Sequence, residues 1–166
     1  MAFVVRIYRA PGAEPLSLVE ATAYFDRQPG FSRQTPEGAP PGSAWFVYEN
    51  ALTGLRFWFL FDARLEEECL AYWESAPADE PLPTPTPLTL SLEVNRPPAW
   101  AQEAFPLLEE AAMSLHLWAR AEAAPEAAPV DVDALIERWN AANAAAGWRP
   151  RRRWGCLPGL FLGGWR

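Results

Sequence analysis

Short runs of apolar residues divide the chain into segments with either strand or helix periodicity. Phe3, Val5 and Ile7 fall on one face of the segment Phe3–Arg9, which predicts a strand. Residues Leu16–Gln28 instead carry apolar side chains at helical spacing, and Pro29-Gly30 would end that helix. Residues Thr35–Ser43 contain three prolines and two glycines, a composition that favours a loop.

The clearest local signal is a pair of aromatic runs that predicts a β-hairpin. Ala44–Asn50 and Leu55–Phe61 are rich in aromatic and β-branched residues, which favour a pleated surface. The short connection between them ends in Gly54, a residue that can adopt a positive φ. The second run is apolar at almost every position, so we expect both of its faces to be covered.

The next segments have mixed periodicity. Residues Arg64–Ser75 match a short helix. Residues Pro77–Pro87 contain the repeat P-L-P-T-P-T-P, which predicts an extended loop, with an SH3-type ligand as the alternative interpretation. Residues Leu88–Asn95 alternate strictly between apolar and polar side chains and predict a half-buried strand.

The last third of the chain predicts two helices separated by a strand. The first helix would cover Pro98–Ala112, and we expect Pro106 to kink or break it. Residues Met113–Ala119 alternate and predict a last strand, Pro125–Pro129 predicts a linker, and Asp131–Ala146 predicts a helix. Together these segments predict a single α+β domain, in which two to four helices pack on an antiparallel sheet of about four to six strands.

The distribution of charge separates the end of the chain from the rest. All 14 basic residues of the 166 are Arg. Residues 1–148 hold 9 Arg against 21 Asp and Glu, a net charge of −12, whereas residues 149–166 hold 5 Arg and no acid. We therefore take residues 1–148 as the domain and residues 149–166 as an Arg- and Trp-rich extension that docks on it. The alternative is an adaptor or chaperone-like tail that contacts nucleic acid or an anionic membrane.

Few residues could support catalysis or metal binding. His116 is the only histidine, and we expect it to be a structural or solvent-facing side chain on the polar side of a strand. Cys69 and Cys156 lack the spacing of a zinc site and suit a reducing compartment. The absence of Lys excludes a P-loop lysine and a Schiff base. We therefore predict no catalytic residue, no metal and no cofactor.

Two runs of carboxylates leave one enzymatic alternative open. Neighbouring acids on a helix point in different directions, so Glu66-Glu67-Glu68 and Glu109-Glu110 are interpreted as solvated faces. A cryptic carboxylate-dependent enzyme remains as an alternative, since paired acids can come from anywhere in a chain. The N-terminal segment lacks the pattern of a signal peptide and no stretch has the length of a membrane span, so we expect a cytoplasmic protein without stable membrane insertion.

Three groups of residues carry a resemblance to a known class. They are Tyr48, Asn50, Thr53 and Gly54 before the aromatic F-W-F; Asn95, Arg96, Pro97 and the later Glu103; and Trp139, Asn140 and Asn143 in the last helix. Over roughly residues 44–143 this pattern resembles the immunity proteins encoded beside Rhs-type, contact-dependent and type VI polymorphic toxins of bacteria. The resemblance implies a protein that binds and neutralises a cognate toxin without catalysis.

The resemblance also implies a protein partner rather than a nucleic acid. A basic toxin would be attracted by the acidic body of this chain, although net negative charge also serves solubility. We expect the shared motif residues to be structural, with Asn50 capping the turn and Gly54 adopting a positive φ. For toxin contact we suggest the acidic face formed by Glu66, Glu67, Glu68 and Glu74. The target of the toxin and the oligomeric state stay open.

Overall fold

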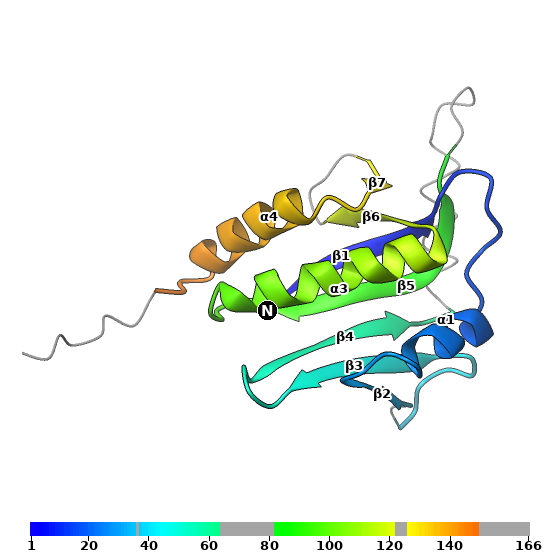
Figure 1. Cartoon of the computed structure of the whole chain (residues 1–166), viewed down its shortest axis with the longest axis horizontal. Coiled ribbons are helices and arrows are strands. Elements are labelled where there is room, and N and C mark those ends of the chain that lie inside the picture. Colours follow the sequence, from blue (N-terminus) through cyan, green and yellow to red (C-terminus); the bar gives the residue numbers. More distant parts are fainter. Residues whose placement is uncertain (36, 64–81, 122–125, 150–166) are drawn as a thin grey trace, which may run out of the picture.

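The computed structural model describes residues 1–35, 37–63, 82–121 and 126–149 (Figure 1). The strands in these ranges are β1 (Ala2–Arg9), β2 (Phe31–Gln34), β3 (Ala44–Asn50), β4 (Leu55–Phe61), β5 (Thr84–Glu93), β6 (Leu117–Ala121) and β7 (Ala128–Pro129). The helices are α1 (Leu18–Phe25), α3 (Ala99–Leu115) and α4 (Val132–Ala145).

The strands form one antiparallel sheet in the order β2-β3-β4-β5-β1-β6-β7. The N-terminal strand β1 therefore lies inside the sheet, between β5 and β6. The predicted class, a single α+β domain with an antiparallel sheet and a few helices, is confirmed. In the described ranges the sheet has seven strands, one more than the upper bound that we expected.

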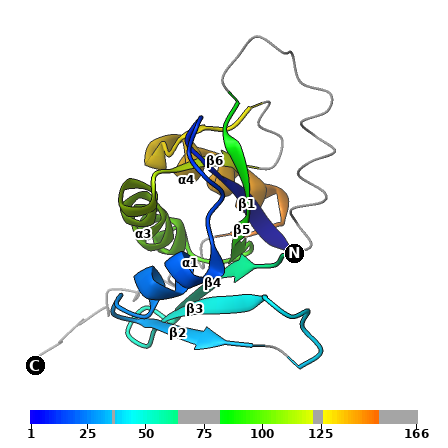
Figure 2. The same cartoon turned by 90° about the vertical axis from the view of Figure 1, so that its right-hand side faces the viewer.

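One face of the sheet packs against the helices and forms the core. Helices α1 and α3 lie together on this face (Figure 2). Phe57 and Phe59 of β4 are fully buried there, and the ring of Phe25 from α1 stacks on that of Phe46 with centroids 4.6 Å apart. Burial of this aromatic area is the main stabilising contribution that the sequence supplies.

The other face of β4 departs from our expectation of complete cover. Trp58 and Leu60 alternate with the buried phenylalanines and point to the opposite face, where both are only half-buried. The cover that we expected over both faces of this strand is thus only partial at these two positions. The bounds predicted for the hairpin of β3 and β4 are confirmed.

Other element boundaries differ from the sequence prediction. Strand β5 begins at Thr84, so its first residues belong to the segment that we predicted to be a loop. The ladder between β1 and β5 is irregular between Arg6 and Tyr8, and Pro85 stands opposite Tyr8 just beyond that point. A bulge or irregularity tolerates proline because no regular N–H bond is required there.

Helix α3 extends three residues further than expected. Residues Met113–Leu115 are helical rather than extended, and His116 ends the helix in a left-handed conformation with φ 51°. The expected position of His116 on a strand was therefore wrong, although the side chain is solvent-exposed as expected. Pro106 lies inside α3 without dividing it. The short strands β2 and β7 were not predicted.

Several predicted features lie outside the described residues. These are the helix over Arg64–Ser75 with Glu66, Glu67, Glu68 and Glu74, both cysteines, and the C-terminal extension beyond Arg149.

Candidate functional site

Three motif residues of the hairpin donate hydrogen bonds to the carboxylate of Glu103. Tyr48 Oη and Asn50 Nδ2 donate to Glu103 Oε1 at 2.9 and 2.6 Å, and Thr53 Oγ1 donates to Oε2 at 2.9 Å. These four residues, called the Glu103 cluster below, join the hairpin to α3. Burial raises the pKa of Tyr48, and the hydrogen bond to Glu103 and its negative charge raise it further.

The turn chemistry of the hairpin supports this cluster. Asn50 Oδ1 accepts a hydrogen bond from the backbone of Leu52 at 3.0 Å, and Gly54 adopts φ 68°. Both roles that we expected from the sequence are thus present. The ring of Tyr48 lies against Gly30, where an added Cβ would come within 2.7 Å of Tyr48 Cε2. Gly30 therefore fixes the position of the tyrosine that reaches Glu103.

The second set of motif residues meets at Asn143 of α4. Asn143 Oδ1 accepts hydrogen bonds from the backbone N–H groups of Asn95 and Arg96, at 2.5 and 3.0 Å. Its Nδ2 donates to the carbonyl of Arg96 at 2.7 Å. The side chain is 1% exposed, and Asn95 adopts φ 65°. Asn143 thus holds the connection between β5 and α3, whose first turn begins with the bond from Trp100 N to Pro97 O.

The other motif residues of α4 contribute to the core or to its border. Trp139 is fully buried and Asn140 is half-buried. The structure therefore brings the predicted motif residues into two structural clusters, and neither cluster resembles a catalytic centre.

A groove opens on the sheet face opposite the phenylalanine core. It has a volume of about 490 Å³. Trp45, Val47 and Trp58 reach it from alternate positions of β3 and β4, which place them on that face. We call it the tryptophan groove, and its described lining residues are Trp45, Val47, Gly54, Arg56, Trp58, Glu93, Arg96 and Trp100.

The lining of the tryptophan groove is held by contacts among its own residues. The rings of Trp45 and Trp58 stack with centroids 6.3 Å apart and planes at 12°. The guanidinium of Arg96 lies 4.9 Å from the ring centroid of Trp100 and pairs with Glu93. Aromatic rings and guanidinium groups held in this way are common in binding surfaces.

Our sequence analysis missed this groove. The available signal was the alternation in the two aromatic runs, because Trp45 and Trp58 fall on the face opposite Phe46, Phe57 and Phe59. Trp45 and Trp58 are diagonal neighbours, since they pair with Leu60 and Val47, and this could have been anticipated from the hairpin register. The approach of Arg96 and Trp100 could not, since Arg96 comes from the connection before α3 and Trp100 from its first turn.

A buried arginine of β1, which was not singled out from the sequence, links this strand to α1 and α3. Arg9 Nη1 donates to the carbonyl of Leu115 at 2.7 Å, and Nη2 donates to both carboxylate oxygens of Glu20 at 2.5 Å. The Arg9 side chain is 10% exposed. A cation at the C-terminus of α3 is favoured by the helix dipole, so this contact is structural.

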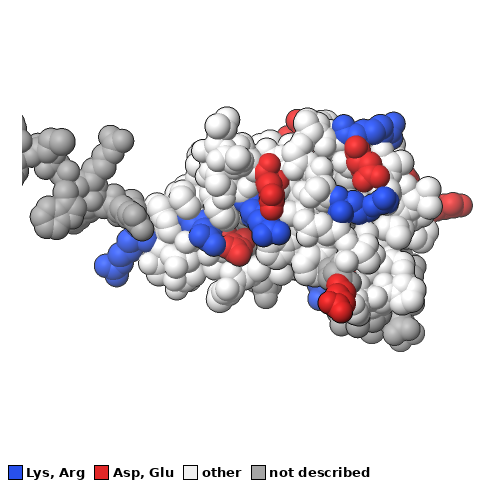
Figure 3. Space-filling model, turned by 90° about the horizontal axis from the view of Figure 1, so that it is seen from below, with Lys and Arg blue, Asp and Glu red and all other residues white. Residues whose placement is uncertain are grey.

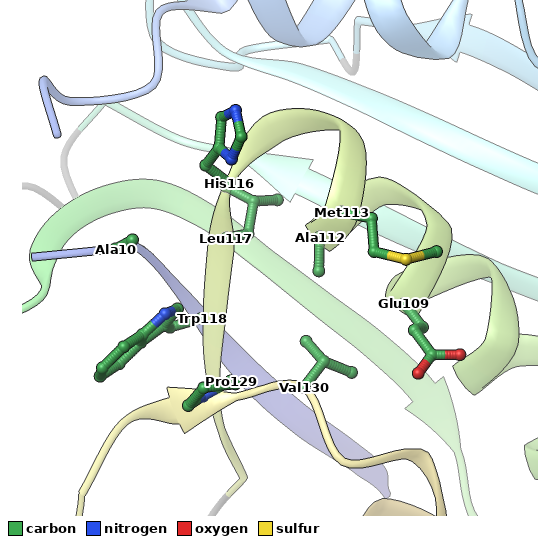
Figure 4. Close-up of a pocket in the computed structure, with 9 residues that line it drawn as sticks. All are labelled: Ala10, Glu109, Ala112, Met113, His116, Leu117, Trp118, Pro129 and Val130. Carbon is green, nitrogen blue, oxygen red and sulfur yellow. The ribbon is translucent and has the colours of Figure 1, made fainter.

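A second pocket surrounds His116 at the end of α3. It has a volume of about 270 Å³ and includes Glu109, Met113, Trp118 and Val130 in its lining. The His116 ring and the Glu109 carboxylate point in opposite directions from the last turns of the helix (Figure 4). An acid–base pair requires convergent groups within hydrogen-bond reach, so these two residues do not form one.

One face of the molecule carries charges of both signs. In Figure 3 acidic and basic side chains lie beside one another rather than in separate patches. Two of the exposed ion pairs are Arg33–Asp26 at 3.8 Å and Arg56–Glu49 at 3.0 Å. The acidic contact face suggested from the sequence lies outside the described residues, as stated above.

Searches for other types of site were negative in the described ranges. No group of three or more His, Cys, Asp or Glu side chains there could hold a metal ion. None of the helices described has the length and apolar character that crossing a bilayer requires. Comparison with family models, with curated proteins and with solved structures finds no match to this chain.

Proposed function

We propose that this chain is a non-catalytic immunity protein that binds and neutralises a cognate bacterial toxin domain. The observation that supports the proposal most is the convergence of the motif residues. Tyr48, Asn50 and Thr53 meet Glu103 across 50 to 55 positions of sequence, and Asn143 meets Asn95 and Arg96 across 48 and 47 positions. The residues that carry the resemblance therefore act together as a framework in this fold.

Such a framework suits inhibition by binding. It fixes the hairpin and the start of α3 on either side of an open groove, so a partner would meet a surface that needs little rearrangement. Preorganised surfaces lose less conformational entropy on association and gain affinity in consequence. Occupation of the toxin's active-site region would then block access of its substrate. We place this encounter in the cytoplasm, in keeping with two cysteines whose spacing suits a reducing compartment.

The test is a binding and rescue experiment with the toxin domain encoded by the adjacent upstream gene. We expect the purified chain to form a stoichiometric complex with that domain in calorimetry, and its expression to restore growth of cells that make the toxin. A natively folded chain that neither binds the domain nor restores growth would exclude this function.

A further inference from the structure

We infer that the tryptophan groove is the surface that contacts the toxin, and that it receives a protein loop bearing a carboxylate beside an apolar side chain. This inference rests on the proposed function and names the contact surface and the chemistry of its partner. The acidic face suggested from the sequence would be a separate contact.

The polar atoms that line the groove are mainly hydrogen-bond donors. Trp45, Trp58 and Trp100 each carry an indole N–H, and an arginine guanidinium carries five N–H donors and no acceptor. No hydrogen bond from these three indoles to the described residues is found. Arg56 approaches Glu49 through Nε, and among the described residues no contact of its two Nη groups is found. A donor-rich groove is complementary to an acceptor-rich ligand, and a carboxylate fits a guanidinium best.

One carboxylate oxygen of the groove is already engaged by an arginine of the lining. Glu93 is the acidic residue among the described lining residues, and its Oε2 accepts from both Nε and Nη2 of Arg96. Each of the two arginines of the lining pairs with one glutamate, Arg96 with Glu93 and Arg56 with Glu49, which is not itself a lining residue. Five N–H donors on each guanidinium and one on each indole still outnumber the carboxylate acceptors, which favours an acceptor such as a carboxylate on the partner.

The apolar walls explain why the partner also needs an apolar side chain. Trp45 and Trp58 present a stacked pair that is only half-buried, and Val47 forms the floor at 1% exposure. Tryptophan and arginine are the residue types that dominate the energy of protein interfaces. A protein loop is favoured over a nucleic acid because the overall negative charge of this chain would repel phosphates at longer range.

The decisive variant is Arg56→Glu, and the chain provides a matched control in Arg33→Glu. Both arginines lie on strands, both are in exposed ion pairs, and their side chains are 56% and 50% exposed. We expect Arg56→Glu to weaken binding of the upstream toxin domain at least ~10-fold, because it replaces an attraction by a repulsion. Arg33→Glu should change the affinity by less than about threefold. Thermal unfolding of each variant checks that it is folded.

Trp58→Ala provides a second measurement, and we expect it to weaken binding by a similar factor through the lost aromatic contact. If the wild-type chain binds the toxin and both groove variants bind as tightly, the groove assignment is wrong while the proposed function stands. If the wild-type chain does not bind the toxin domain, both the groove assignment and the proposed function are wrong. Tight binding of a single-stranded oligonucleotide that depends on Arg56, or a dimer of this chain that Arg56→Glu dissociates, would also overturn the assignment.

Discussion

The hydroxyl of Tyr48 and the carboxylate of Glu103 lie 2.9 Å apart, although 55 positions separate them along the chain. Asn50 and Thr53 complete the contacts of the same carboxylate, and all three donors are neutral. The negative charge of Glu103 is therefore stabilised by aligned dipoles rather than by a cation. This arrangement fixes distance and direction more strictly than an ion pair between long side chains would.

Replacement of Glu103 by Gln tests the contribution of the cluster. The amide of Gln would direct its NH₂ group at one of the three donors, so at least one hydrogen bond is lost and the charge is removed. We expect the free energy of unfolding to fall by about 2 kcal/mol, the scale of hydrogen bonds to charged groups. Urea denaturation measures the change. Glu109→Gln, at an exposed site on the same helix, should stay within ~0.5 kcal/mol, and equal losses in both variants would contradict the role of the cluster.

The raised pKa of Tyr48 predicts a loss of stability in alkaline solution. Burial and the neighbouring Glu103 both favour the protonated phenol in the folded state, so the unfolded state releases its proton first as the pH rises. The stabilisation is complete below about pH 10 and is lost as the pH rises through the folded-state pKa. Urea unfolding from about pH 8 to about pH 11 should therefore show a smaller decline in Tyr48→Phe than in the wild-type chain.

Part of the alkaline decline should persist in Tyr48→Phe. Burial also raises the pKa of Tyr24, with a smaller contribution in the same direction from the charge of Glu110. Tyr24→Phe measured alongside provides the control. A Tyr48→Phe variant with the full wild-type decline would show that Tyr48 does not carry the effect.

Gly30 offers a test in which backbone strain and steric contact can be separated. Gly30 and Gly12 have φ values of +82° and +79°, but an added Cβ meets Tyr48 only at Gly30 and has nothing within 4 Å at Gly12. We expect Gly12→Ala to cost about 1 kcal/mol for the left-handed backbone alone. Gly30→Ala should cost ~1 to 2 kcal/mol more, because Tyr48 must move away from Glu103. Thermal unfolding of the two variants measures these losses of stability. Equal losses would mean that the Tyr48 ring moves aside without cost.

Asn143 should be the most sensitive polar residue of α4. Removal of its side chain leaves two N–H groups and one carbonyl of the connection before α3 without partners, in a site that is 1% exposed. We expect Asn143→Ala to lower the free energy of unfolding by about 3 kcal/mol. Asn140→Ala, one turn earlier and half-buried, should cost less than ~1 kcal/mol. Guanidinium denaturation compares the two, and a small loss at Asn143 would refute the assignment.

The sequence predicted the elements that rest on local pattern and missed those that depend on distant partners. The hairpin bounds were correct because aromatic alternation and the Thr53-Gly54 turn are both local signals. The strand predicted from the sequence began later than β5 because prolines argue against a hydrogen-bonded ladder. The irregularity in β1 that accommodates Pro85 lies some 80 positions away in the chain. The same limitation applies to β2, whose four residues become a strand by pairing with β3.

The candidate site, too, was predicted only where local pattern or the resemblance pointed to it. The resemblance identified the members of the Glu103 cluster, but spacing alone could not show that three hairpin side chains share one carboxylate on α3. The tryptophan groove was missed because an apolar run was interpreted as doubly covered. Its half-exposed tryptophans become visible only when the register of β3 and β4 is combined with the place where α3 begins.

The central position of β1 has a consequence for synthesis of the protein. Strand β1 is synthesised before both of its hydrogen-bonding neighbours, which end only at Glu93 and Ala121. At roughly 5–20 residues per second, β1 waits on the order of 5 to 20 seconds for its second neighbour. The hairpin of β3 and β4 can close by itself within that interval. Strand β1 is therefore open to mispairing for longer than the strands of the hairpin.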